Sequence, residues 1–111
     1  MPVYVDDIRR TPVSKRWPFP WGCHMAADTL PELHSFALRI GLRLSWFQDG
    51  RHPHYDLNTS KRAVAVTYGA QELSSRGLLR VVQACKAAID KARELGHVGL
   101  PYGGRPRRSK A

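Results

Sequence analysis

The sequence predicts a single small domain of the α/β or α+β class, with one sheet of three to four short strands and about three helices. Its 111 residues are typical of one domain. Short β-prone runs alternate along the chain with segments of helical periodicity. Neither a GxGxxG motif nor a P-loop is present, so no Rossmann unit is predicted. We expect residues 1–99 to fold and residues 100–111 to form a disordered basic tail.

The first predicted elements are two strands joined by a long loop. Residues 3–5 (VYV) and 22–27 (GCHMAA) are the strand candidates. The intervening residues 8–21 contain three prolines, two tryptophans and four basic residues, which excludes a regular helix. Because this loop has no crossover helix, we expect the first two strands to be antiparallel.

A helix over residues 30–40 follows. Thr29 and Glu32 have the spacing of a capping box, apolar residues recur at helical spacing, and Gly41 stands at the stop position. Residues 42–47 (LRLSWF) alternate as a third strand would, and Asp-Gly then signals a turn. Residues 52–57 form a short fourth extended piece.

Two more helices complete the prediction. Asn58, Thr59 or Ser60 caps the second, which runs towards Tyr68 and ends at Gly69. The third covers about residues 75–95, where apolar side chains share one stripe and charged ones lie elsewhere.

The composition narrows the classes of function. The chain has 18 Lys and Arg against 9 Asp and Glu, a net charge of +9, of which +4 lies in the tail. No apolar run reaches 18 residues, and acids stand where a signal peptide would be apolar, so a cytoplasmic protein without membrane contact is expected. The two cysteines, Cys23 and Cys85, form no CxxC and are expected to be reduced.

Polar side chains follow the predicted strands, at the sheet end where ligands of α/β proteins gather. Asp7 and Asp28 are the metal-ligand candidates, for a divalent ion such as Mg²⁺ or Mn²⁺, and His24 is a catalytic candidate. The alternative is structural: Asp28 as a helix cap, Asp6 as a solvated strand end, and His24 as a hydrogen-bonded histidine.

The sharpest local feature runs from His54 to Arg62. His54 and Asp56 are predicted catalytic groups, and Ser60, Lys61 and Arg62 at the following helix start are predicted to hold a phosphate. The alternative is a solvated cationic turn. Arg10 and Trp46 complete the predicted ligand-binding set.

These features favour a domain that binds, and hydrolyses or transfers, a phosphate-bearing ligand such as a nucleotide. The alternative is a nucleic-acid-binding accessory protein without catalysis. It would use the basic and aromatic residues of the long loop, together with the tail. Those loop residues are Lys15, Arg16, Trp17, Phe19 and Trp21.

The order of several motifs resembles one family. YVDD, W-x-x-H-M-A-A-D, ELHSFALRIGL, WFQ and HYDLNTSKRAVAVTYGA, over about residues 3–70, resemble the bacterial and phage family called domain of unknown function 4031. The last helix and the tail lie outside the resemblance. It implies a small cytoplasmic or phage-encoded protein with no established reaction, and relatives joined to phosphohydrolase-type domains favour phosphate chemistry. Its recurring polar positions correspond here to Asp6, Asp7, His24, Asp28, His34, His54, Asp56, Lys61 and Arg62.

Overall fold

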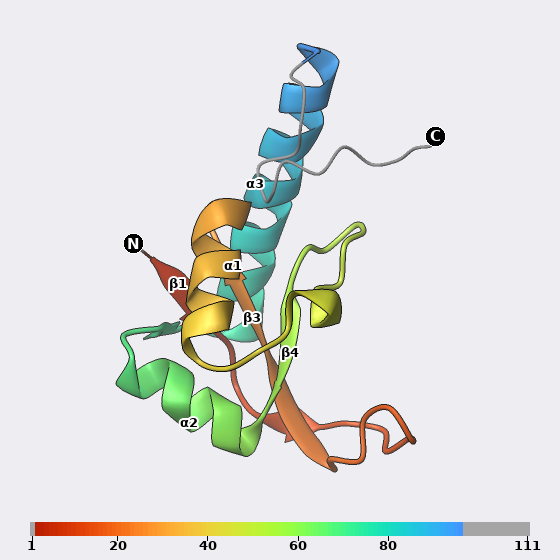
Figure 1. The fold of residues 1–111 in the computed structure, drawn as a ribbon, viewed down its shortest axis with the longest axis vertical. Coiled ribbons are helices and arrows are strands. Elements are labelled where there is room, and N and C mark those ends of the chain that lie inside the picture. The colour runs from red at the N-terminus through yellow and green to blue at the C-terminus, as the bar shows by residue number, and fades with distance from the viewer. Residues whose placement is uncertain (1, 97–111) are drawn as a thin grey trace.

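The computed structural model describes residues 2–96, in which three α-helices pack around a small mixed sheet (Figure 1). The elements are β1 (Val3–Val5), β2 (Arg9–Arg10), β3 (Trp21–Ala27), α1 (Leu30–Arg39), the 3-10 helix η1 (Leu44–Trp46), β4 (Tyr55–Asn58), α2 (Thr59–Thr67), β5 (Gln71–Glu72) and α3 (Ser75–Glu94). The predicted α/β class is confirmed. The predicted disorder of residues 100–111 lies outside the described residues.

β3 is the central strand of the sheet. β4 runs antiparallel along one edge of it, and β1 and β2 share the other edge, also antiparallel. β5 extends the sheet beyond β1 in the parallel direction. The antiparallel pairing of the first two predicted strands is therefore confirmed. The side chains of β3 have β1 and β2 on one side and β4 on the other.

The edge formed by β1 and β2 carries a bulge. Val5 pairs with Met25 and Arg9 pairs with Gly22, so residues 6–8 on one strand face only residues 23–24 on the other. Such an extra residue bends the strand and re-aims a side chain. Here the backbone N–H of Asp6 still donates to the carbonyl of His24, at 3.2 Å. The bulge thus holds Asp6 beside His24.

The two faces of β3 pack against different side chains, although α3 contributes to both, with Cys85 and Ile89 in the main core. Cys23, Met25 and Ala27 are buried in the main core, to which α1 and α2 contribute Leu33 and Ala65, among others. On the opposite face, Ala26 packs against Leu78 and Val82 in the first half of α3. His24 lies on this second face because side chains alternate along a strand.

All three predicted helices are confirmed, and each begins at a side-chain cap. Thr29 accepts a hydrogen bond from the backbone N–H of Glu32, as the predicted capping box requires. Asn58, the first of the three predicted candidates, caps α2 by accepting from the backbone N–H of Lys61 at 2.8 Å. Ser74 caps α3. No helix in the described range is long and apolar enough to cross a membrane.

The predicted strand over residues 42–47 is wrong. Leu42 enters the core, but the chain then turns into η1, which leaves Leu44 and Trp46 about half exposed, at 47% and 52%. Apolar alternation therefore did not reflect a buried sheet face in this segment. The edge of β4 instead receives one isolated bridge, between Gln48 and His54.

The long loop before β3 is ordered by its own polar and aromatic contacts. The indole N–H of Trp17 donates to the hydroxyl of Thr11 at 2.9 Å, and its ring meets Phe19 edge-on. β2 at the start of this loop, and β5 after α2, are two-residue strands that sequence periodicity did not indicate. Strands this short carry no alternation pattern.

Candidate functional site

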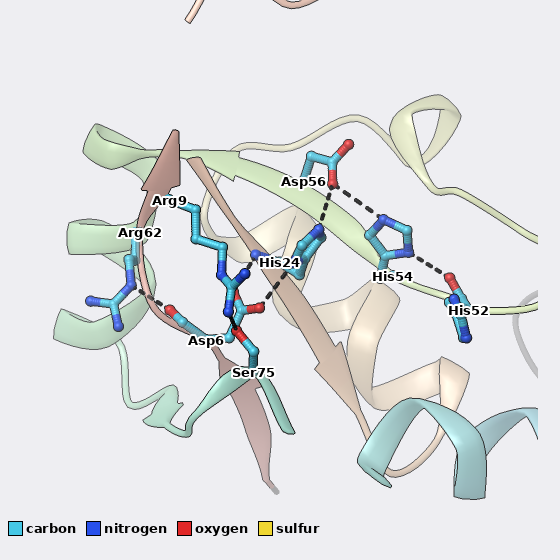
Figure 2. Close-up of polar contacts among 8 residues, drawn as sticks. All are labelled: Asp6, Arg9, His24, His52, His54, Asp56, Arg62 and Ser75. Carbon is cyan, nitrogen blue, oxygen red and sulfur yellow. Dashed lines mark hydrogen bonds and ion pairs between the residues drawn. The ribbon is translucent and has the colours of Figure 1, made fainter. Parts of the chain in front are cut away.

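Two histidines and one aspartate converge on the α3 face of the sheet (Figure 2). His24 of β3 and Asp56 of β4 are direct partners across the strand pair. His54 precedes Asp56 by two residues, so its side chain lies on the same face. Each of the three side chains offers one ligand atom, and these atoms lie within 4.8 Å of one another.

The carboxylate of Asp56 is the centre of this group. Its Oδ1 lies 3.2 Å from Nε2 of His54 and 3.9 Å from Nε2 of His24. The other carboxylate oxygen, Oδ2, accepts a hydrogen bond from the side-chain amide of Gln48. Gln48 reaches it because the bridge between Gln48 and His54 holds that segment beside β4.

Asp6 fixes His24 from the opposite side. This aspartate is 2% exposed, and its carboxylate accepts from the backbone N–H of His24 at 2.7 Å and from Nδ1 of the same residue at 2.9 Å. A carboxylate can only accept, so Nδ1 of His24 carries the hydrogen, and Nε2 is the ring nitrogen that faces the cluster. The half-exposed imidazole, at 48%, is thereby oriented without being buried.

The contacts within the site shift the pKa values of Asp6, Asp56 and His54. Burial raises the pKa of Asp6, but the hydrogen bonds from His24 outweigh it, so the pKa lies below the usual value. Burial likewise raises the pKa of Asp56, and the contacts with His54 and Gln48 reverse the shift. Burial lowers the pKa of His54, but hydrogen bonds to Asp56 and to the carbonyl of His52 raise it overall. Both carboxylates are therefore ionised near neutral pH.

A pocket of about 250 Å³ opens beside the cluster. Its polar lining includes Asp6, His24 and His54, and the first turns of α3 contribute an apolar wall of Leu78, Leu79 and Val82. Arg9 and Ser75 also line it, and the guanidinium of Arg9 donates to the hydroxyl of Ser75 (Figure 2). The pocket therefore joins imidazoles, one carboxylate and one guanidinium to an apolar surface.

The predicted metal ligands Asp7 and Asp28 lie outside the cluster of ligand atoms that the described residues form. Asp7 is exposed. Asp28 is exposed beyond the end of β3 and accepts a hydrogen bond from the hydroxyl of Tyr4, at 3.4 Å. His24 and Asp28 are four residues apart, a separation of about 13 Å along an extended strand. Metal binding by Asp7 and Asp28 stays a prediction that these contacts do not favour.

Lys61 and Arg62 are engaged by the protein itself. Nζ of Lys61 donates to the carbonyl of Ile40 at the end of α1, at 2.6 Å. Arg62 donates from Nε to the backbone carbonyl of Asp6 at 2.9 Å and pairs with Glu72 at 3.1 Å. The start of α2 lies over the core-side face of the sheet, so it does not share the face of His54 and Asp56. Ser60 is exposed in the first turn of α2.

The two remaining predicted ligand contacts are exposed cation–aromatic pairs. The guanidinium of Arg10 lies over the ring of Trp21, 5.3 Å from its centroid. Trp46 is covered in the same way by Arg43, at 5.9 Å. Neither Arg10 nor Trp46 lines the pocket beside His24.

The cysteines take no part in the cluster. Both are free and buried, and burial raises the pKa of the Cys23 thiol to about 12. A thiol with such a pKa is almost wholly protonated at neutral pH and is a poor nucleophile.

Sequence reasoning found three members of the site and missed the residues around them. His24, His54 and Asp56 are predicted site residues. Asp6 is predicted only as one of the family's recurring polar positions, with a solvated strand end as the alternative, and it is in fact buried. Arg9 and Ser75 have no predicted site role. The available signal was the alternation in His54-Tyr55-Asp56, which places the first and third side chains on one face of a strand.

Comparison with known proteins assigns the chain to a family. It belongs to the family described as Protein of unknown function (DUF4031), whose model matches residues 3–85. The predicted resemblance is confirmed, and the match extends past residue 70 into α3, so it includes Ser75 as well as the whole cluster. No curated protein and no solved structure matches the chain.

Proposed function

We propose that the domain binds a phosphate-bearing ligand, such as a nucleotide, in the pocket beside His24 and His54 and hydrolyses its phosphate ester. One observation carries the proposal: the Arg9 guanidinium lines the same pocket as two oriented imidazoles. Guanidinium groups bind phosphate oxygens in a bidentate manner, which fixes the phosphate as well as attracting it.

The rest of the lining fits the two ends of such a ligand. Ser75 begins α3, where the free N–H groups and the helix dipole favour an anion next to Arg9. Leu78, Leu79 and Val82 provide an apolar wall for a less polar portion, such as a base. The volume is slightly below the range of about 300–1,000 Å³ for drug-sized ligands, so a small ligand is favoured.

His24, His54 and Asp56 form the cluster that lies next to the proposed position of the phosphate ester. A phosphate on Arg9 would share the pocket with His24 of β3 and with His54, which precedes β4. Asp56 lies behind His54, with its Oδ1 3.2 Å from Nε2 of that residue. Hydrolysis forms a bond between phosphorus and a water oxygen and breaks the bond to the ester oxygen, which leaves as the alcohol. The cytoplasm is the compartment we propose for this activity, since both thiols are buried and free.

The test compares two arginines in a thermal-shift screen of nucleotides and phosphosugars, with and without Mg²⁺ or Mn²⁺. A charged hydrogen bond is worth about 1.5–3 kcal/mol, so Arg9→Ala weakens a true ligand by roughly tenfold or more. Arg62→Ala leaves ligand affinity unchanged, because that side chain is engaged by Asp6 and Glu72. Loss of affinity in Arg62→Ala alone would place the phosphate at the start of α2, as the sequence predicted.

A second candidate function is nucleic-acid binding. The exposed ring of Trp21, with Arg10 above it, is a surface on which a base can stack. Trp17, by contrast, is held within its loop. Salt-dependent binding of single-stranded oligonucleotides that is lost in Trp21→Ala and kept in Arg9→Ala would favour this reading.

A further inference from the structure

We infer that His24, His54 and Asp56 form a binding site for one divalent transition-metal ion of the zinc, cobalt or manganese type. Two imidazole nitrogens and one carboxylate oxygen are common protein ligands of such ions. This metal site does not depend on phosphate binding, because the positions of the three ligand atoms support it without any phosphate.

The spacing of the ligand atoms suits a single ion. Two ligands on one tetrahedral zinc, each at 2.0–2.1 Å, are about 3.3 Å apart. The measured separations from Oδ1 of Asp56 are 3.2 Å to His54 and 3.9 Å to His24. Figure 2 shows the two imidazoles reaching Asp56 from different sides, and their ring planes are inclined by 77°.

The strongest support is the set of groups behind the three ligands. Metal-binding histidines donate their second ring N–H to a carboxylate or a carbonyl, which fixes the ring and leaves the other nitrogen for the metal. Nδ1 of His24 meets the buried carboxylate of Asp6, and Nδ1 of His54 meets the carbonyl of His52. Gln48 holds the far oxygen of Asp56 in the same manner. Each candidate ligand is therefore oriented by a partner of its own.

The local charge and the solvent access of the cluster also favour a bound cation. The carboxylates of Asp6 and Asp56 lie 2.9 Å and 3.2 Å from the imidazoles of His24 and His54, and two carboxylates balance the charge of a dication. His24 is half exposed and lines the pocket, so an ion has a route to the cluster and keeps open positions for water or phosphate. Two nitrogen ligands disfavour Mg²⁺ and Ca²⁺, which prefer oxygen.

The test is titration of the full chain with Zn²⁺, Co²⁺, Mn²⁺ and Mg²⁺ alone, by calorimetry and by the visible absorption of Co²⁺. We expect one Zn²⁺ or Co²⁺ per chain and at least tenfold weaker binding of Mg²⁺. His24→Ala, His54→Ala and Asp56→Asn should each weaken Co²⁺ binding by about a hundredfold, since loss of outer groups alone costs 10–100-fold.

Two matched controls separate this site from other histidines and carboxylates. His52→Ala keeps the carbonyl that serves His54 and should leave the affinity within twofold, as should Asp28→Asn. Circular dichroism of each metal-free variant verifies that it folds. The inference fails if the wild type binds no Zn²⁺ or Co²⁺, or if His52→Ala or Asp28→Asn weakens binding as much as the ligand variants. Because no phosphate is present, failure here leaves the phosphate proposal standing.

Discussion

Removing the Asp6 carboxylate should destabilise the domain far more than removing that of its neighbour Asp7. Asp6→Ala deletes the acceptor for the backbone N–H of His24, at 2.7 Å, and for its imidazole, at 2.9 Å. A backbone donor left without a partner costs about 1–3 kcal/mol, and the imidazole contact adds less because His24 is half exposed.

We therefore expect Asp6→Ala to lower the free energy of unfolding by about 2–3 kcal/mol. For a domain of this size, that corresponds to a fall in Tm of roughly 10–20 °C. Asp7→Ala removes an exposed carboxylate and should stay within about 0.5 kcal/mol. Asp6→Asn should fall between the two, because its amide oxygen can still accept from the backbone N–H.

The assay is urea unfolding followed by circular dichroism, at several pH values. The pKa of Asp6 is lower in the folded state than its ordinary value of 3.8, so its stabilisation is complete above that value and is lost as the pH falls through the folded-state pKa. The gap between wild type and Asp6→Ala should accordingly be constant from pH 7 to 5 and shrink below pH 4. Equal destabilisation by Asp6→Ala and Asp7→Ala would refute the role assigned to the bulge.

Three further predictions concern the core, the long loop and the tail. Burial lowers the pKa of His34 more than the charge of Asp49 raises it, so the contribution of His34 to stability should fall as the pH drops below 6.5. The difference in unfolding free energy between wild type and His34→Gln should therefore shrink towards acid pH in the same assay. Gly22→Ala places a Cβ 2.9 Å from both the carbonyl oxygen of Leu57 and the ring of Trp17, and should cost about 1–3 kcal/mol in thermal unfolding. Truncation after Leu100 should leave the Tm unchanged, since the described core lies within residues 3–89, and should weaken heparin binding at low salt because +4 of charge is removed.

The helices were predictable because their signals are local. Thr29 and Asn58 are caps, and Gly41 adopts the left-handed backbone, φ +88°, that ends a helix. The strand predicted over residues 42–47 is wrong because alternation shows only that a strand is possible. Whether the segment joins a sheet depends on a free sheet edge beside it. The available edge of β4 took the Gln48–His54 bridge instead.

The site was only partly predictable because some of its contacts follow from local sequence and others from the pairing of distant strands. His54 and Asp56 share a face by local alternation, but the choice between Asp6 and Asp7 depends on one extra residue opposite β3. That bulge turns the first carboxylate inward against His24 and leaves the second in solvent. Likewise, Lys61 and Arg62 follow Asp56 closely in sequence, yet α2 folds onto the other face of the sheet. Their charges stabilise the ends of α1 and β1, through the carbonyls of Ile40 and Asp6. A cationic helix start therefore predicts a phosphate site only where its side chains lack carbonyl partners within the fold. In this domain the cation that lines the pocket with the histidines is Arg9, which comes from β2 and not from a helix start.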